Sequence, residues 1–139
     1  MSDPPAPRPG EKLPPLTIGP FSAADLGDYA EASGDSNPLH LDLDFARGFG
    51  FEARPAHGMR LLAGFEPLLR DWRPDLVTIG LSGQFLTPVL EKQTAVLSAR
   101  VAKIETAENG FVVVLRLMAH AENGAPALVG EARLTPAPL

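Results

Sequence analysis

A carboxylic acid, an amide and an imidazole lie close together in residues 33–40, which read SGDSNPLH. Asp35 and His40 carry side chains of different intrinsic acidity, so one can accept a proton while the other donates one. Pro38 fixes its own φ angle and restricts the backbone of Asn37, which stiffens the segment. Because general acid–base catalysis depends on accurate placement, a stiff loop of this composition favours that chemistry.

Simpler explanations of the same residues stay open at this point. Asp35 and Asn37 are also common turn formers that bond the backbone two residues on, and His40 would be unremarkable as a solvated or core histidine. A metal site is disfavoured, because His40 and His57 lack the spacing of a helical ligand pair. The sequence has neither a glycine-rich phosphate loop nor a G-x-S-x-G elbow.

Composition excludes several classes of protein. The 139 residues suit one domain, and a formal net charge of −5 argues against nucleic-acid binding. The absence of cysteine excludes disulfides, thiol nucleophiles and thiolate metal sites. No apolar run approaches the ~20 residues of a membrane span, and no targeting signal is visible. We therefore expect a cytoplasmic protein that binds neither nucleic acid nor membrane.

Proline content separates the ends of the chain from its middle. Residues 1–15 hold six of the fifteen prolines, which predicts a flexible tail. Residues 136–139 are expected to fray, so that residues 16–135 form one domain.

The first half of this domain reads as helices and a long loop. Ser22 and Asp25 form a capping-box pattern, and Gly34 is a typical helix end. Residues 34–56 read as an irregular loop with a short helix over 43–48, and such long loops are usually functional. Residues 57–71 are apolar on most sides, which predicts a buried helix that Pro67 kinks or shortens.

The second half reads as antiparallel strands. The strands are expected at residues 76–87, 93–106, 110–121 and 126–135, which are rich in Val, Leu, Ile, Thr and Phe. The Asn-Gly pairs at 109–110 and 123–124 predict hairpin turns. A buried helix followed by a meander suggests an α+β domain with a curved sheet wrapped around one helix.

Taken whole, residues 33–59 resemble the MaoC-like (R)-specific enoyl-CoA hydratase family. The segment matches the pattern S-G-D-x-N-P-x-H-x-D, then A, then G-F, then P-x-x-H-G-M, with the spacing kept throughout. The lead-in at residues 21–25 and the stretch at 85–89 extend the resemblance more weakly. It implies a single hot-dog domain, a five-stranded antiparallel sheet around a central helix, that pairs as a homodimer.

The resemblance also implies a reaction and residues for it. The reaction is reversible (R)-specific hydration of a trans-2-enoyl-CoA, without metal or cofactor and with coenzyme A as the carrier of the acyl substrate. Asp35 and His40 match the acid–base pair, and Asn37 matches a position that orients the water. His57 and Gly58 are expected at the substrate, with the Gly58 N–H as oxyanion donor, although His57-Gly58 also reads simply as a helix start.

Competing functions are a 3-hydroxyacyl-ACP dehydratase, a thioester hydrolase, and a non-catalytic subunit that binds acyl thioesters. The paired Asp35 and His40 disfavour the last two, which typically lack the pair. Arg60 and Glu66 depart from an apolar central helix, so each either pairs locally, lies at an interface, or lines the acyl pocket. Leu90-Glu91-Lys92 replaces the family's usual turn at that point.

Overall fold

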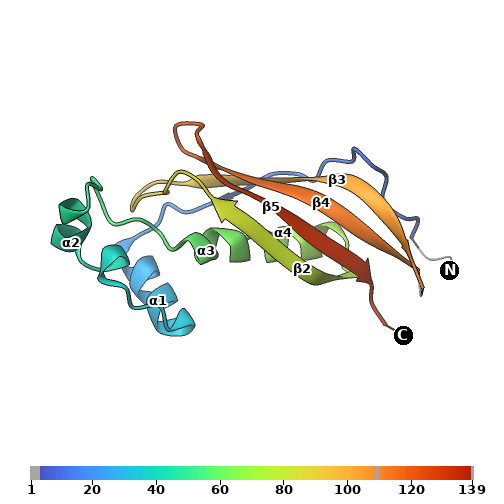
Figure 1. Ribbon diagram of the computed structural model, residues 1–139, viewed down its shortest axis with the longest axis horizontal. Coiled ribbons are helices and arrows are strands. Elements are labelled where there is room, and N and C mark those ends of the chain that lie inside the picture. The colour runs from blue at the N-terminus through green and yellow to red at the C-terminus, as the bar shows by residue number, and fades with distance from the viewer. Residues whose placement is uncertain (1–3, 109, 139) are drawn as a thin grey trace.

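The computed structural model describes residues 4–108 and 110–138 and forms one sheet with helices on one side (Figure 1). The sheet has five strands in the order β1-β3-β4-β5-β2, all antiparallel to their neighbours. In chain order the elements are β1 (Leu16–Ile18), α1 (Ala23–Ser33), the 3-10 turn η1 (Pro38–His40), α2 (Leu43–Gly48), α3 (Gly58–Ala63), α4 (Phe65–Trp72), β2 (Leu76–Phe85), β3 (Ala95–Ala107), β4 (Gly110–Ala121) and β5 (Pro126–Pro136). This architecture confirms the hot-dog fold.

The helices α1 and α2 lie together at one end of the molecule, at the left of Figure 1. α1 begins with the expected capping box, since Ser22 Oγ accepts from the Asp25 N–H and the Asp25 carboxylate accepts from the Ser22 N–H. It ends at Gly34, whose φ of 79° is readily adopted only by glycine. The short helix α2 spans the predicted residues 43–48.

The central helix is divided in two at Gly64, where α3 ends and α4 begins. Pro67 explains the division, because its ring clashes with the carbonyl of residue 63 and it has no N–H to bond there. Gly64 fits where the helix approaches β3 closely, since a Cβ at this position would lie 2.9 Å from Leu97 Cδ1. The predicted effect of Pro67 is thus confirmed, and the break itself falls three residues earlier.

The four predicted strands are present, and the fifth is β1, which the sequence analysis did not identify. β1 has only three residues and pairs with β3 through Leu16, Thr17 and Ile18. Residues 10–13, in the stretch expected to be a tail, also lie along β3. The Gly10 N–H donates to the Val101 carbonyl and the Leu13 N–H to the Ala99 carbonyl. Leu13 is buried, so contacts with the sheet begin before residue 16.

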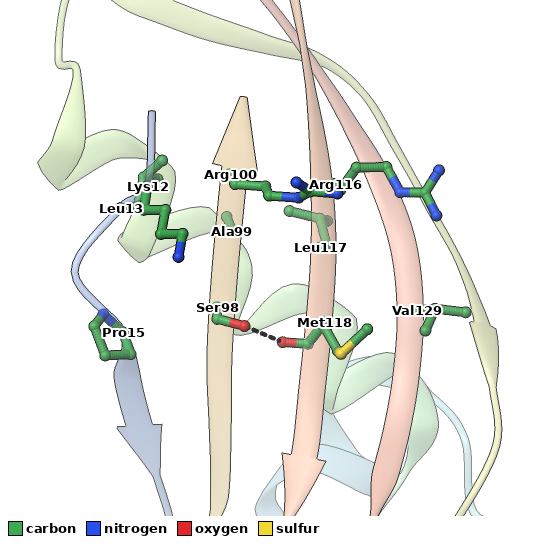
Figure 2. A pocket seen from close by; sticks show the side chains of 10 residues that line it. All are labelled: Lys12, Leu13, Pro15, Ser98, Ala99, Arg100, Arg116, Leu117, Met118 and Val129. Atoms are coloured by element: carbon green, nitrogen blue, oxygen red, sulfur yellow. Dashed lines mark hydrogen bonds between the residues drawn. The ribbon is translucent and has the colours of Figure 1, made fainter. Parts of the chain in front are cut away.

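The two faces of the sheet differ in character. The inner face packs against α3 and α4 in one core, whose largest buried members include Phe65, Leu69, Leu97, Leu115, Leu117 and Leu128. On the outer face, a hollow of about 400 Å³ lies beside Lys12, Arg100 and Arg116. Figure 2 shows the side chains that line it. There Ser98 Oγ donates to the Met118 carbonyl at 3.3 Å. Among the described helices, none is long and apolar enough to cross a membrane.

Candidate active site

The loop after α1 presents Asp35 with its backbone held on both sides. The Asp35 N–H donates to Ser33 Oγ at 3.2 Å, and Asp35 Oδ1 accepts from the Asn37 N–H at 3.2 Å. Asn37 Oδ1 in turn accepts from the Leu39 N–H at 3.0 Å and caps η1. Both residues therefore do form turns, as the simpler explanation of the sequence expected. Each turn engages one side-chain oxygen and leaves the second oxygen of Asp35 and the amide NH₂ of Asn37 for other partners.

His40 is oriented by a backbone carbonyl. Its Nδ1 lies 2.8 Å from the Pro55 carbonyl oxygen, which can only accept a hydrogen bond, so Nδ1 carries the hydrogen. In the neutral ring Nε2 is then the atom with a free lone pair. Pro55 is itself fixed by an antiparallel bridge to Leu90, and the neighbouring Ala56 N–H donates to the Val89 carbonyl.

His57 lies against His40 and is almost fully covered, with 1% of its surface exposed. The two imidazole rings are stacked, with centroids 3.9 Å apart and an interplanar angle of 24°. His57 Nε2 donates to the Asp35 carbonyl oxygen at 3.1 Å, and the ring of Tyr29 lies 4.8 Å from its centroid. His57 thus contacts both members of the expected acid–base pair.

Asp35, His40 and His57 each offer one potential ligand atom, and these atoms all lie within 4.8 Å of one another. A shared metal ion would need the lone pairs of both imidazoles to converge on it. Stacked rings instead hold their lone pairs in two nearly parallel planes, which disfavours convergence on one ion. The geometry is better suited to a water held between Asp35 and His40, since general acid–base groups act across one hydrogen-bonded molecule.

Gly58 follows His57 at the start of α3, where His57 makes no side-chain cap bond. The free N–H groups of a first helical turn face outward from the helix. A Cβ at position 58 would lie 3.0 Å from three atoms of the Phe85 ring, so any larger residue would require that ring to move. The absence of a side chain at Gly58 therefore accommodates Phe85 of β2.

An ion pair that sequence reasoning missed ties the site loop to the turn between β2 and β3. Arg54 Nε and Nη2 donate to the two carboxylate oxygens of Glu91, both at 2.8 Å, and Nη1 donates to the Leu41 carbonyl at 3.2 Å. Hydrogen bonding from Arg54 holds the pKa of Glu91 below its usual value. Glu91 belongs to the turn that departs from the family pattern, and this contact gives that departure a structural role.

Arg60 and Glu66, the two charged residues that depart from the apolar pattern of the central helix, both have partners within the chain. The Arg60 guanidinium lies 5.8 Å from the centroid of the Phe21 ring, in a hollow of about 440 Å³ that it shares with Asp25 and Asp28 of α1. Glu66 lies 3.9 Å from Arg70 and accepts from Thr78 Oγ1 at 3.1 Å. The alternative of a local pair is thus confirmed for Glu66, and the effect of Arg60 on the acyl site stays a prediction.

Several known proteins resemble this chain in sequence or in structure. A family model described as "MaoC like domain" matches residues 6–122. The (R)-specific enoyl-CoA hydratase of Aeromonas caviae is 33% identical over 114 residues, which are 81% of this chain and 84% of that protein. A mitochondrial 3-hydroxyacyl-[acyl-carrier-protein] dehydratase of Arabidopsis thaliana is 42% identical over 69 residues, 50% of this chain and 42% of that one.

The chain therefore spans less than half of the plant enzyme and most of the bacterial one. Among solved structures, the A. caviae (R)-hydratase involved in PHA biosynthesis superimposes with a TM-score of 0.85 at 30% identity, over 95% of this chain and 98% of that one. The R-hydratase PhaJ1 of Pseudomonas aeruginosa gives 0.77 at 26% identity, over 93% of this chain and 81% of that one. The match over residues 6–122 and the hydratase's 33% identity over 81% of this chain show that it belongs to the MaoC-like domain family.

Proposed function

We propose that the protein hydrates trans-2-enoyl-CoA reversibly to (R)-3-hydroxyacyl-CoA, with Asp35 and His40 as its acid–base pair. The observation that carries this proposal is the approach of one ligand atom each from Asp35, His40 and His57 to within 4.8 Å. A gap of this size between an acid and a base suits one bridging water. The family relationship and the A. caviae relative support the same reaction.

In the forward reaction, the water bridges the Asp35 carboxylate and His40 Nε2. His40 Nε2 accepts a proton while the water oxygen bonds to C3, and the electron pair of the double bond moves towards the thioester oxygen. The same Nε2 then returns its proton to C2, and Asp35 orients the water by accepting its second hydrogen. Because one nitrogen serves both carbons from one side, the addition is syn, and the enzyme ends in its starting state.

The thioester oxygen becomes an enolate oxygen during this step and needs hydrogen-bond donors. The Gly58 N–H is our candidate, since α3 starts there and His57 makes no side-chain cap bond. The amide NH₂ of Asn37 is available to the water or the substrate, because its Oδ1 is occupied by the Leu39 N–H. No step in this scheme requires a metal or an added cofactor.

The carrier of the acyl group is tested by a paired assay. Purified protein is given crotonyl-CoA or the crotonyl thioester of an acyl carrier protein, and the loss of enoyl absorbance is followed. Faster turnover of the CoA thioester supports the proposal, whereas faster turnover of the carrier-protein thioester supports a dehydratase like the Arabidopsis relative. Release of free thiol would indicate a hydrolase, and no turnover of either thioester would indicate a binding subunit.

We further propose that the protein is a homodimer that pairs through β2. This strand lies at the edge of the sheet and exposes apolar side chains, including Val77, Ile79 and Phe85, with Met59 of α3 also exposed. Exposed apolar edge strands are normally covered. Ile79→Glu should shift the sedimentation of micromolar protein from dimer to monomer, and Val96→Glu on the outer face should not. A wild-type monomer with full activity would refute the dimer.

A further inference from the structure

His57 is buried, yet the water-addition scheme gives it no proton to move. Its ring nitrogens show what it does instead. Nε2 must carry the hydrogen, because its partner at 3.1 Å is the Asp35 carbonyl oxygen, which can only accept. Nδ1 is buried and has no hydrogen-bond partner within residues 4–108 and 110–138. A buried polar atom without a partner is costly, so a residue selected for stability alone would not be expected here.

The His57 ring contacts both residues of the proposed catalytic pair, His40 through its face and Asp35 through its Nε2–H. Its face supports the His40 ring at a centroid distance of 3.9 Å, and its Nε2–H fixes the backbone of Asp35. Tyr29 of α1 covers another side of the ring. The Pro55 carbonyl sets the rotation of His40 through Nδ1, but this single bond leaves the ring free to tilt. The stack removes that freedom.

We propose that His57 is a positioning residue, which holds the His40 ring with its face and the Asp35 loop with its Nε2–H. This inference rests on the proposed hydration and goes beyond it, since His57 acts through the catalytic pair and does not touch the reacting atoms. It replaces the expectation from the sequence that His57 binds substrate. The two contacts are separable, because a flat ring and a hydrogen-bond donor can each be kept without the other.

Three substitutions separate the two contacts. His57→Phe keeps a flat face for His40 and loses the donor to Asp35. His57→Gln keeps a donor and loses the flat face, and His57→Ala loses both. Small displacements of a reacting group cost up to about a hundredfold in rate. We expect kcat to fall about tenfold in the Phe and Gln variants and about a hundredfold in the Ala variant, with KM for crotonyl-CoA within threefold of wild type.

Stability distinguishes positioning from packing. Phenylalanine keeps a flat ring, although a larger one, and it removes the unpartnered Nδ1 together with the bond to Asp35. These opposing effects should leave the melting temperature of His57→Phe within about 4 °C of wild type while kcat falls. A residue that only packs would lose activity and stability together. His120→Phe is the matched control, because His120 is a half-buried histidine of β4 whose strand partner is Val96, and it should leave kcat unchanged.

A spectroscopic readout keeps this test independent of hydratase activity. The imidazole nitrogen and carbon signals of His40 in labelled protein report its tautomer and its ring environment. They should move in His57→Gln and His57→Ala and stay near wild type in His120→Phe, even if the enzyme proves to use another reaction. Unchanged His40 signals in His57→Ala, or kcat within twofold of wild type in both the Phe and Ala variants, would overturn the proposal.

Discussion

The helices α1 and α3 begin in opposite ways. At the start of α1, the Ser22 hydroxyl accepts from the Asp25 N–H at 3.0 Å and the Asp25 carboxylate accepts from the Ser22 N–H at 2.9 Å, which satisfies two of the free N–H groups at this end. At the start of α3, His57 occupies the N-cap position and makes no cap bond, because its ring is directed to His40 and to the Asp35 carbonyl. We call the capped start of α1 the closed start and the uncapped start of α3, beside the site, the open start.

This difference shows how a small domain divides two tasks between similar elements. A side chain that caps its own helix stabilises that helix. A side chain that leaves the cap unmade can support neighbouring groups, and the first-turn N–H groups stay available to an acceptor. Changes at the open start should therefore reduce activity more than stability, and changes at the closed start should do the reverse.

The largest expected effect is on the acid–base pair itself. His40→Ala should reduce kcat by about 10²–10⁴-fold, the usual cost of losing a general acid or base. Asp35→Asn should cost about as much, because it removes the carboxylate that holds the water against His40 Nε2. The double variant should be little slower than either single one, because both groups act on one water. Crotonyl-CoA turnover and circular dichroism should be measured together, so that loss of activity is separated from loss of fold. Near-wild-type turnover in either single variant would refute the assignment.

A smaller effect is expected at Gly58. Gly58→Ala would bring a Cβ to 3.0 Å from the Phe85 ring and displace either the ring or the start of α3. We expect about a tenfold loss of kcat/KM, a modest share of the cost of deleting an oxyanion donor. Adding Phe85→Leu should recover most of it by making room.

The matched control for this change is Gly27→Ala in α1, where an added Cβ would meet nothing within 4 Å. The same substitution there should leave kcat/KM unchanged and raise the melting temperature, because alanine favours helix. If Gly58→Ala also leaves kcat/KM unchanged, the close packing at the start of α3 does not matter for activity.

The Arg54–Glu91 pair should contribute to stability in a pH-dependent way. Because Arg54 lowers the folded-state pKa of Glu91, the pair stabilises the protein above the ordinary glutamate range and loses this contribution as the pH falls through the lowered pKa. Glu91→Gln should reduce the free energy of unfolding at pH 7 by about 1 kcal/mol. It should also weaken the dependence of stability on pH in acid, measured by urea unfolding.

Glu105 provides the comparison for this pair, since it bonds Arg133 on the more exposed surface of the sheet. Glu105→Gln should reduce the free energy of unfolding at pH 7 by less than Glu91→Gln does. Equal effects of the two substitutions would contradict the view that Arg54–Glu91 is the pair that secures the site loop.

The smallest effect on activity is expected at the closed helix start. Ser22→Ala removes the cap of α1 and should lower the melting temperature by about 4 °C. kcat for crotonyl-CoA should stay within twofold of wild type, because Ser22 makes no contact with Asp35 or His40. A tenfold loss of kcat would show that the cap of α1 also affects the active site, contrary to the comparison of the two helix starts.

Local sequence patterns predicted much of the secondary structure. The Ser22 capping box, the Gly34 helix end and the four long strands follow from interactions between near neighbours in sequence, so they were visible without the fold. The three-residue strand β1 was missed because its pairing with β3 is a long-range contact and its own pattern is too short. Residues 10–13 join β3 for the same long-range reason.

The residues of the site also divide into those that a local pattern predicts and those that only long-range contacts reveal. Asp35 and His40 stand in one continuous motif, so the family resemblance predicts them from the sequence alone. The stack of His57 on His40 and the bidentate bond of Arg54 to Glu91 depend on how separate segments meet in the fold. The charge of Arg54 within residues 33–59 and the unusual acid in the turn at Glu91 were the available signals, but the sequence does not show that these two residues pair.

The most direct test of the central claim is hydration of crotonyl-CoA in D₂O, with the product analysed for configuration at C2 and C3. If Asp35 and His40 add water from one face, the product is (R)-3-hydroxybutyryl-CoA with one deuterium at C2, introduced syn to the new hydroxyl as a single diastereomer. Asp35→Asn protein of intact fold should give almost none. An (S) product, anti addition, or no hydration by the wild-type protein would contradict the account.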